Sequence, residues 1–384
     1  MNWRAITQGI LHYRRTGPMP VVHFGFWGDT LRKWVAEGHL TAEEISGAGD
    51  STPAEQRLAA KLGFDFNYHT VFNFSSALQP GFPTGIVETL PDGSRKVRDS
   101  EGAVVLQKAG ATGIPMAFDH ALKDRASWEA QFRHRLRYTP ERFERAPVLL
   151  GDRFVPFNEG GREFLVEGRR EFHYGLFCGS LLGQIRSWLG MEGMCYLQAD
   201  DPGLFREIVD ATAEVWYRTT KAVLETGAQF DFGHFWEDIC FRSGPLITPR
   251  VFQEVVGPHY RRITDLLRGC GIDIVSLDCD GCIDALVPIW IENGVNTMFP
   301  IEVGVWNASI RPWRAAYGRE LRGVGGTDKR VFARDRAAVD AEIERLKPLV
   351  DPGGYIPCPD HRIPPDARWD SVRYYCDRMR AAFG

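Results

Sequence analysis

The sequence predicts an α/β protein, a (β/α)8 TIM barrel with an antiparallel β insertion in its N-terminal half. Four short apolar runs in the C-terminal half each end near a carboxylate, and each is followed by a helix signal; they cover 230–235, 272–277, 297–301 and 355–357. Strands that alternate with helices of about ten or more residues indicate βαβ units and a parallel sheet. In such barrels the C-terminal ends of the strands converge on one face, which carries the chemistry.

The N-terminal half begins with a strand expected over 21–26, followed by a helix that ends at Gly38. Thr41 and Glu44 have the spacing of a capping box, and Ser51-Thr52-Pro53 opens a further helix that ends at Gly63. Between 84 and 107 apolar residues alternate around turn signals, which predicts a β-hairpin insertion.

Helical spacing recurs from 122 to 145 and through most of the C-terminal half. Helices are expected over 180–189, 201–225, 248–268, 283–293, 310–317, 337–349 and 370–382. Strands and helices alternate regularly after Gln229, and barrels of this type often exceed about 250 residues, so we expect residues 1–384 to form a single domain.

Composition narrows the class of partner. The formal charge is −4, with acidic and basic residues mixed, whereas a nucleic-acid-binding protein needs a clustered basic face. No apolar stretch approaches the roughly 20 residues that span a bilayer, and residues 1–15 lack the apolar core of a signal peptide. Eight cysteines without framework spacing suit free thiols. We therefore expect a cytoplasmic protein that acts on a small molecule.

Acidic residues and one histidine mark the expected strand ends. Asp278 and Asp280 are two positions apart, so on an extended chain both face the same side. Another run ends at Glu237 and Asp238, and the pattern alone does not decide which of the two faces the site. His361 lies on a stiff, proline-flanked segment. Carboxylates and imidazole together can hold a divalent ion.

Several segments, taken in order, resemble the uroporphyrinogen decarboxylase superfamily. They are Phe24-Gly-Phe-Trp-Gly-Asp-Thr-Leu, Gly244-Pro-Leu-Ile-Thr-Pro-Arg, the run 274–281, Gly325-Gly-Thr-Asp-Lys and Gly353-Gly-Tyr-Ile-Pro. The resemblance runs from about residue 15 to the C-terminus and is weak between 64 and 175. True uroporphyrinogen decarboxylases grip propionates with an arginine-rich N-terminal loop, and residues 22–29 contain no arginine. The chain is therefore more similar to the branch that transfers alkyl groups.

The resemblance also implies site residues. The alkyl-transfer branch binds zinc through a His-x-Cys pair and a cysteine near the last strand, and these positions correspond to Asp278, Asp280 and His361. This set would hold a divalent metal, with zinc as the expected ion. Glu237, Asp278 and Asp280 are then the candidate catalytic residues. The candidate substrate-binding residues are Phe24, Phe26, Trp27, Trp236, Glu302 and Arg330.

The resemblance implies a metal-dependent methyltransferase or demethylase that moves a methyl group from a small O- or N-methyl compound to a corrinoid on a separate protein. Members of the superfamily often form homodimers. One alternative is a metal-free decarboxylase or lyase in which Asp278 and Asp280 serve as acid and base. Another is a binding protein that kept the barrel without catalysis.

Overall fold

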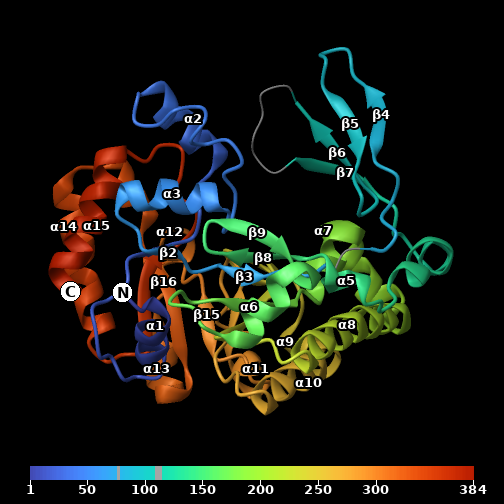
Figure 1. The fold of residues 1–384 in the computed structure, drawn as a ribbon. Coiled ribbons are helices and arrows are strands. Elements are labelled where there is room, and N and C mark those ends of the chain that lie inside the picture. The colour runs from blue at the N-terminus through green and yellow to red at the C-terminus, as the bar shows by residue number, and fades with distance from the viewer. Residues whose placement is uncertain (76–77, 109–114) are drawn as a thin grey trace.

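The computed structural model describes residues 1–75, 78–108 and 115–384, and its centre is a sheet of seven parallel strands (Figure 1). Their spatial order is β17-β16-β15-β14-β11-β10-β3. Their bounds are β3 Val71–Phe72, β10 Gly175–Gly179, β11 Phe232–Trp236, β14 Val275–Asp278, β15 Thr297–Phe299, β16 Arg322–Thr327 and β17 Tyr355–Pro359. The predicted α/β class with a parallel central sheet is confirmed.

Two further strands adjoin this sheet. β1 (Val22–His23) pairs in parallel with β2 (Phe66–Asn67). Beyond β1, Phe26 bridges Ile363 just after β17, and the Ile363 N–H donates to the Gly25 carbonyl at 3.0 Å. This bridge attaches the N-terminal part of the chain to the segment that follows β17, an edge strand of the seven-stranded sheet.

Helices cover the outside of the sheet, with α14 and α15 on one side and α8 and α10 on the other (Figure 1). The longer ones are α1 Trp3–Leu11, α2 Gly28–Ala36, α3 Pro53–Leu62, α7 Leu182–Asp200, α8 Pro202–Glu225, α10 Gly257–Gly269, α13 Ile310–Tyr317, α14 Arg336–Val350 and α15 Trp369–Phe383. The shorter ones are α4 Arg125–Ser127, α5 Glu141–Glu144, α6 Arg162–Glu167, α9 Pro249–Val251, α11 Val287–Glu292 and α12 Val303–Trp306. None of the helices in the described parts of the chain is long and apolar enough to cross a membrane.

The antiparallel insertion is present and larger than the sequence indicates. Its strands are β4 Gly85–Thr89, β5 Arg95–Arg98, β6 Ala103–Gln107 and β7 Met116–His120, paired in chain order. It projects away from the central sheet (Figure 1). The predicted end at 107 is therefore too early, because β7 pairs with β6 across a connection at 109–114 that lies outside the described residues. Two small hairpins, β8 (Pro147–Leu150) with β9 (Arg153–Pro156) and β12 (Cys240–Phe241) with β13 (Gly244–Pro245), were not predicted.

The helical spacing over 122–145 corresponds to several short helical segments and not to one continuous helix. This stretch contains the single turn α4, a π-helical turn over 128–132, a 3-10 turn over 133–135 and α5. Trp128 and Phe132 are fully buried, so tertiary packing and not a continuous helical ladder fixes this segment. The capping box at Thr41 forms as predicted, with the Glu44 N–H donating to the Thr41 hydroxyl at 3.2 Å, but only turns follow it.

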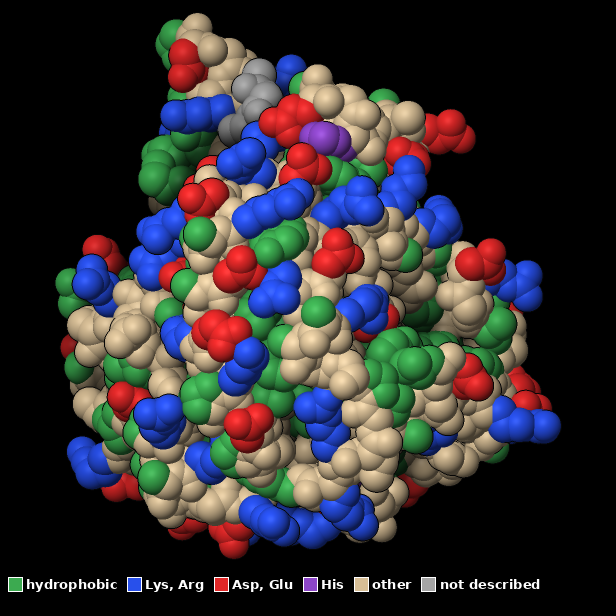
Figure 2. Space-filling model, turned by 90° about the vertical axis from the view of Figure 1, so that its left-hand side faces the viewer, with side chains coloured by type: hydrophobic (Ala, Val, Ile, Leu, Met, Phe, Trp, Pro, Cys, Tyr) green, Lys and Arg blue, Asp and Glu red, His purple; other side chains and the backbone are tan. Residues whose placement is uncertain are grey.

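The surface carries charges of both signs. On the face shown in Figure 2, Lys and Arg side chains alternate with Asp and Glu. Many of these charges form ion pairs within a helix, such as Arg268 with Asp265 in α10 at 2.8 Å and Lys347 with Glu344 in α14 at 2.6 Å.

Candidate metal and substrate site

Neighbouring strand ends bring three carboxylates together. Trp236 at the end of β11 pairs with Asp278 at the end of β14, so the residues that follow these strands are adjacent. One oxygen each from Asp238, Asp278 and Asp280 lies within 4.8 Å of the others. The Asp280 N–H also donates to Asp238 Oδ1 at 3.1 Å. We call these three residues the acidic cluster.

Burial and mutual repulsion make the acidic cluster costly to ionise. Burial, and then the charges of Asp238 and Asp280, raise the pKa of Asp278 well above its usual range. Burial and the charge of Asp280 likewise raise the pKa of Asp238. Glu302 lies close by, and burial together with Asp280 raises its pKa to about 7. At neutral pH this region therefore favours a bound proton or a bound cation.

His361 joins the same rim as Asp280. Its Nε2 lies 3.2 Å from Asp280 Oδ2, which confirms that residues far apart in the sequence meet at one face. The imidazole stacks on Trp27, with ring centroids 5.6 Å apart and planes 20° apart, and Phe24 meets it edge-on at 5.6 Å. Trp27 and Phe24 therefore fix the orientation of the ring.

The donor set fits a divalent cation. Asp280 Oδ1 is buried and has no hydrogen-bond partner, and such an orphaned oxygen is costly unless a ligand satisfies it. Carboxylate oxygens supplemented by imidazole suit zinc, manganese or iron. The residues that would hold the ion are Asp238, Asp278 and Asp280, with His361 beside them.

A second group of possible ligands lies beside the acidic cluster. His69, just after β2, and His234 in β11 have ring centroids 4.7 Å apart. One ligand atom from each lies within 4.8 Å of the other and of an oxygen of Asp278. We call His69, His234 and Asp278 the histidine group. Burial lowers the pKa of both histidines, so both imidazoles are neutral at pH 7.

A cation that the sequence did not single out also lies at this face. Arg362 forms a bidentate ion pair with Asp50. Its guanidinium carbon lies 5.8 Å from the ring centroids of both Phe24 and Trp27. Burial raises the pKa of Asp278, and the guanidinium charge of Arg362 offsets only part of that rise. A fixed positive charge therefore stands beside the acidic residues.

Glu237 has a different environment from Asp238. Its buried carboxylate accepts the N–H groups of Leu181, Leu182 and Gly183, at 2.9, 2.8 and 2.7 Å, and the hydroxyl of Tyr260. These amides belong to the start of α7, where a carboxylate is favourable. Between the two acids that the sequence left open, Asp238 is the one that joins Asp278 and Asp280.

Of the other predicted site residues, some lie at the acidic cluster and others do not. Glu302 accepts the Gly281 N–H at 2.5 Å and so lies at the acidic cluster. Trp236 is half-buried at the end of β11, and its hydrogen bond to Asp238 offsets a small part of the rise that burial causes in the pKa of that carboxyl group. Phe26 instead packs against Trp34 and Phe64, at 5.9 and 6.4 Å between ring centroids. Arg330 donates from Nε and Nη2 to the Asp328 carboxylate, and its side chain is 56% exposed.

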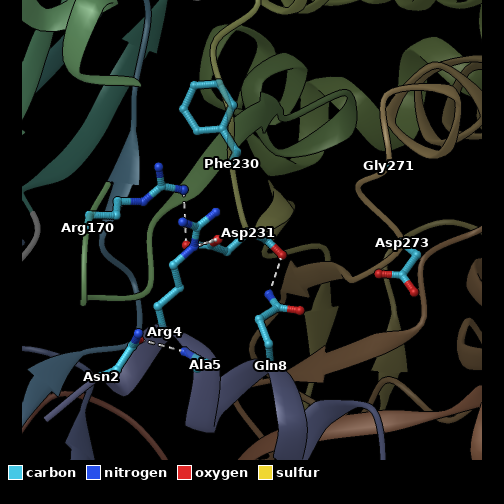
Figure 3. A pocket seen from close by; sticks show the side chains of 9 residues that line it. All are labelled: Asn2, Arg4, Ala5, Gln8, Arg170, Phe230, Asp231, Gly271 and Asp273. Atoms are coloured by element: carbon cyan, nitrogen blue, oxygen red, sulfur yellow. Dashed lines mark hydrogen bonds and ion pairs between the residues drawn. The ribbon is translucent and has the colours of Figure 1, made fainter. Parts of the chain in front are cut away.

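A polar cavity of about 430 Å³ lies near the opposite ends of the strands (Figure 3). Its lining includes Asp231, just before β11, which accepts from Arg4 at 2.6 Å and from Arg170 at 3.1 Å. These ion pairs attach α1 to the sheet. In barrel proteins this end serves stability and not chemistry.

Comparison with known proteins identifies the fold. No known protein family and no curated protein matches the sequence. Among solved structures, the methyltransferase from Methanosarcina mazei aligns with a TM-score of 0.59 at 12% identity, covering 99% of this chain and 98% of that one. A putative vitamin-B12-independent methionine synthase from Listeria monocytogenes gives a TM-score of 0.43 at 12% identity, covering 96% and 100%. A B12-independent methionine synthase from Shewanella gives 0.45 at 12%, covering 95% and 98%. The likeness to the M. mazei methyltransferase extends over nearly the full length of both chains and shows that the two proteins share a fold.

Proposed function

We propose that this chain is a metal-dependent methyltransferase that removes a methyl group from a small O- or N-methyl compound. The observation that carries the proposal is the convergence of Asp238, Asp278 and Asp280 at one buried strand-end face, beside His361. The M. mazei methyltransferase, which has the same fold over its full length, supports the reaction class. A closed eight-stranded barrel, a single domain and a corrinoid acceptor on a separate protein are parts of the same proposal.

The protein's residues would prepare the site for the reaction. The acidic cluster would hold the divalent ion, which supplies Lewis acidity toward the oxygen or nitrogen that loses the methyl group. Phe24 and Trp27 hold His361 in place and offer an apolar wall to the methyl-bearing part of the substrate. Arg362 would favour a substrate with an anionic group beside this wall.

Asp280→Asn tests the proposal directly. Protein purified without chelator should contain at least one equivalent of zinc, manganese or iron. Methyl transfer from a panel of O- and N-methyl compounds to cob(I)alamin should fall by at least about tenfold in Asp280→Asn, because one ligand becomes a weaker neutral donor. Asp273→Asn, at the opposite strand ends, is the matched control and should keep full activity. Full activity in protein stripped of metal would overturn the proposal.

Glu302 favours one alternative, a metal-free decarboxylase or lyase. A carboxyl group with a pKa of about 7 can deliver a proton at neutral pH. In that case Glu302→Gln would lower kcat strongly, and removing metal would leave kcat unchanged. The two measurements together separate the two functions.

A further inference from the structure

The histidine group lies on one face of the central sheet, next to the acidic cluster. His234 in β11 pairs in register with Ser276 in β14, and Asp278 follows Ser276 by two positions. Because side chains alternate along a strand, His234 and Asp278 lie on the same face of the sheet. His69 reaches them from the end of β2. Aromatic rings surround the pair: Phe299 lies 5.9 Å from His234, and Phe24 lies 6.1 Å from His69.

The nitrogens of these rings are buried without partners. Both ring nitrogens of His69 and Nε2 of His234 have no hydrogen-bond partner. A buried donor or acceptor left unpaired costs about 1 to 3 kcal/mol, so three such atoms side by side are unusual in a folded protein. A packing role alone would be filled more cheaply by phenylalanine or leucine.

One ring is already oriented for a ligand. His234 Nδ1 lies 2.7 Å from the Ser276 hydroxyl, which occupies that nitrogen and leaves Nε2 free. Metal-binding histidines characteristically use the second nitrogen in this way, because the outer hydrogen bond fixes the ring and its tautomer. Ser276 therefore acts as a positioning residue for His234.

We propose that His69, His234 and Asp278 form a buried binding site for one first-row divalent transition-metal ion. Two neutral imidazoles and one carboxylate suit zinc, iron or manganese, whereas magnesium and calcium prefer oxygen ligands only. The site is separate from the acidic cluster in its imidazole ligands and shares Asp278 with it. It does not depend on the proposed methyl transfer.

The test counts the imidazoles bound to Zn²⁺ in the full-length protein by X-ray absorption at the zinc edge. Metal-free wild type loaded with one equivalent of Zn²⁺ should show two imidazole ligands. His69→Gln and His234→Gln should each lose one and weaken Zn²⁺ binding by more than about tenfold. His361→Gln and Asp280→Asn are the matched controls and should keep both imidazoles, because they alter only the acidic cluster and its neighbour.

Binding should also show as a rise in Tm when Zn²⁺ is added, since an ion that binds only the folded state stabilises it. That rise should be smaller in the His69→Gln, His234→Gln double variant, in which only the acidic cluster can still bind Zn²⁺. Fewer than two imidazoles in the wild type would overturn the inference even if a variant fails to fold. So would a double variant that binds Zn²⁺ as tightly as the wild type. The test measures the number of imidazole ligands and Tm, and neither depends on methyl transfer. The inference can therefore hold or fail independently of the proposed reaction.

Discussion

Asp278 is the residue on which both candidate ligand groups depend. It ends β14, opposite Trp236 on one side and Phe299 on the other, so it belongs to a fully paired part of the sheet. Its carboxylate lies within 4.8 Å of a ligand atom of each other member of both groups. Removing a charge from such a place should stabilise the fold while removing a ligand.

Asp278→Asn should therefore raise the stability of the metal-free protein. The folded-state pKa of Asp278 is raised above its unfolded value, so wild type loses stability as pH rises between the two values. The variant escapes this loss, and we expect it to be about 1 to 2 kcal/mol more stable at pH 8, with a smaller gain at pH 5. Urea unfolding in the presence of chelator measures both. A variant less stable than wild type at pH 8 would show that Asp278 is held by favourable contacts instead.

The sequence predicted the acids of the site better than its histidines. Asp278 and Asp280 could be found because an apolar strand leads directly to them. His69 could not, since β2 and β3 on either side of it are two residues long and give no alternating pattern. Arg362 adjoins His361, but its pairing with Asp50 depends on the chain's two ends meeting.

Among the elements, β10 shows how closely the helices pack on the sheet. Gly179 ends this strand with φ +119°, and a Cβ there would lie 2.2 Å from the Trp216 ring of α8. The Trp216 side chain of the helix therefore packs directly on the Gly179 backbone of the strand. Glycine is needed both for the backbone conformation and for the close approach.

Gly179→Ala should destabilise the protein by about 3 kcal/mol or more, since it combines overpacking with a strained backbone. Gly85→Ala is the matched control, because Gly85 begins the exposed strand β4 and a Cβ there meets nothing within 4 Å. The control should change stability by about 0.5 kcal/mol or less. Thermal unfolding of both variants measures the difference, and equal Tm values would contradict the packing argument.

Elements with strong local signals were predictable, and those fixed by packing were not. The helix expected over 201–225 is α8, since Asp201 caps it and Pro202 opens it. The strand β16 has three glycines among its six residues, which hides its apolar pattern. The end of the insertion was misplaced because β7 is half-exposed to exposed throughout and has no buried face.

At the scale of the whole molecule, buried ionisable groups of opposite behaviour set the response to pH. Burial lowers the pKa of His23 to about 3 and of His173 to about 4, so these two contribute stability that is lost as pH falls below 6.5. Burial raises the pKa of Glu55 and Glu302 to about 7, so these contribute stability that is lost as pH rises above 4.5. The histidine and glutamate contributions oppose each other, so the free energy of unfolding changes less with pH than either contribution alone. Single variants measure each contribution separately.

His173→Phe isolates one of these parts. His173 stacks on Phe232 with ring centroids 4.5 Å apart and planes 3° apart, and neither ring nitrogen has a partner, so phenylalanine can keep the stack. At pH 7.5 His173 is neutral in both states, whereas at pH 5 the unfolded chain gains a proton that the folded protein refuses. The variant should therefore gain about 2 kcal/mol over wild type when pH falls from 7.5 to 5.

Urea unfolding at the two pH values measures the free energy of unfolding of both proteins. The contributions of carboxyl groups that both proteins share cancel in the difference between them. His134→Gln, at an exposed position, is the matched control and should show no such gain. An equal pH response in wild type and His173→Phe would mean that His173 takes up a proton in the folded state. Because its ring lies between Tyr68 and Phe232, with Asp231 as the nearby carboxylate, that result would require the packing around β11 to open in acid.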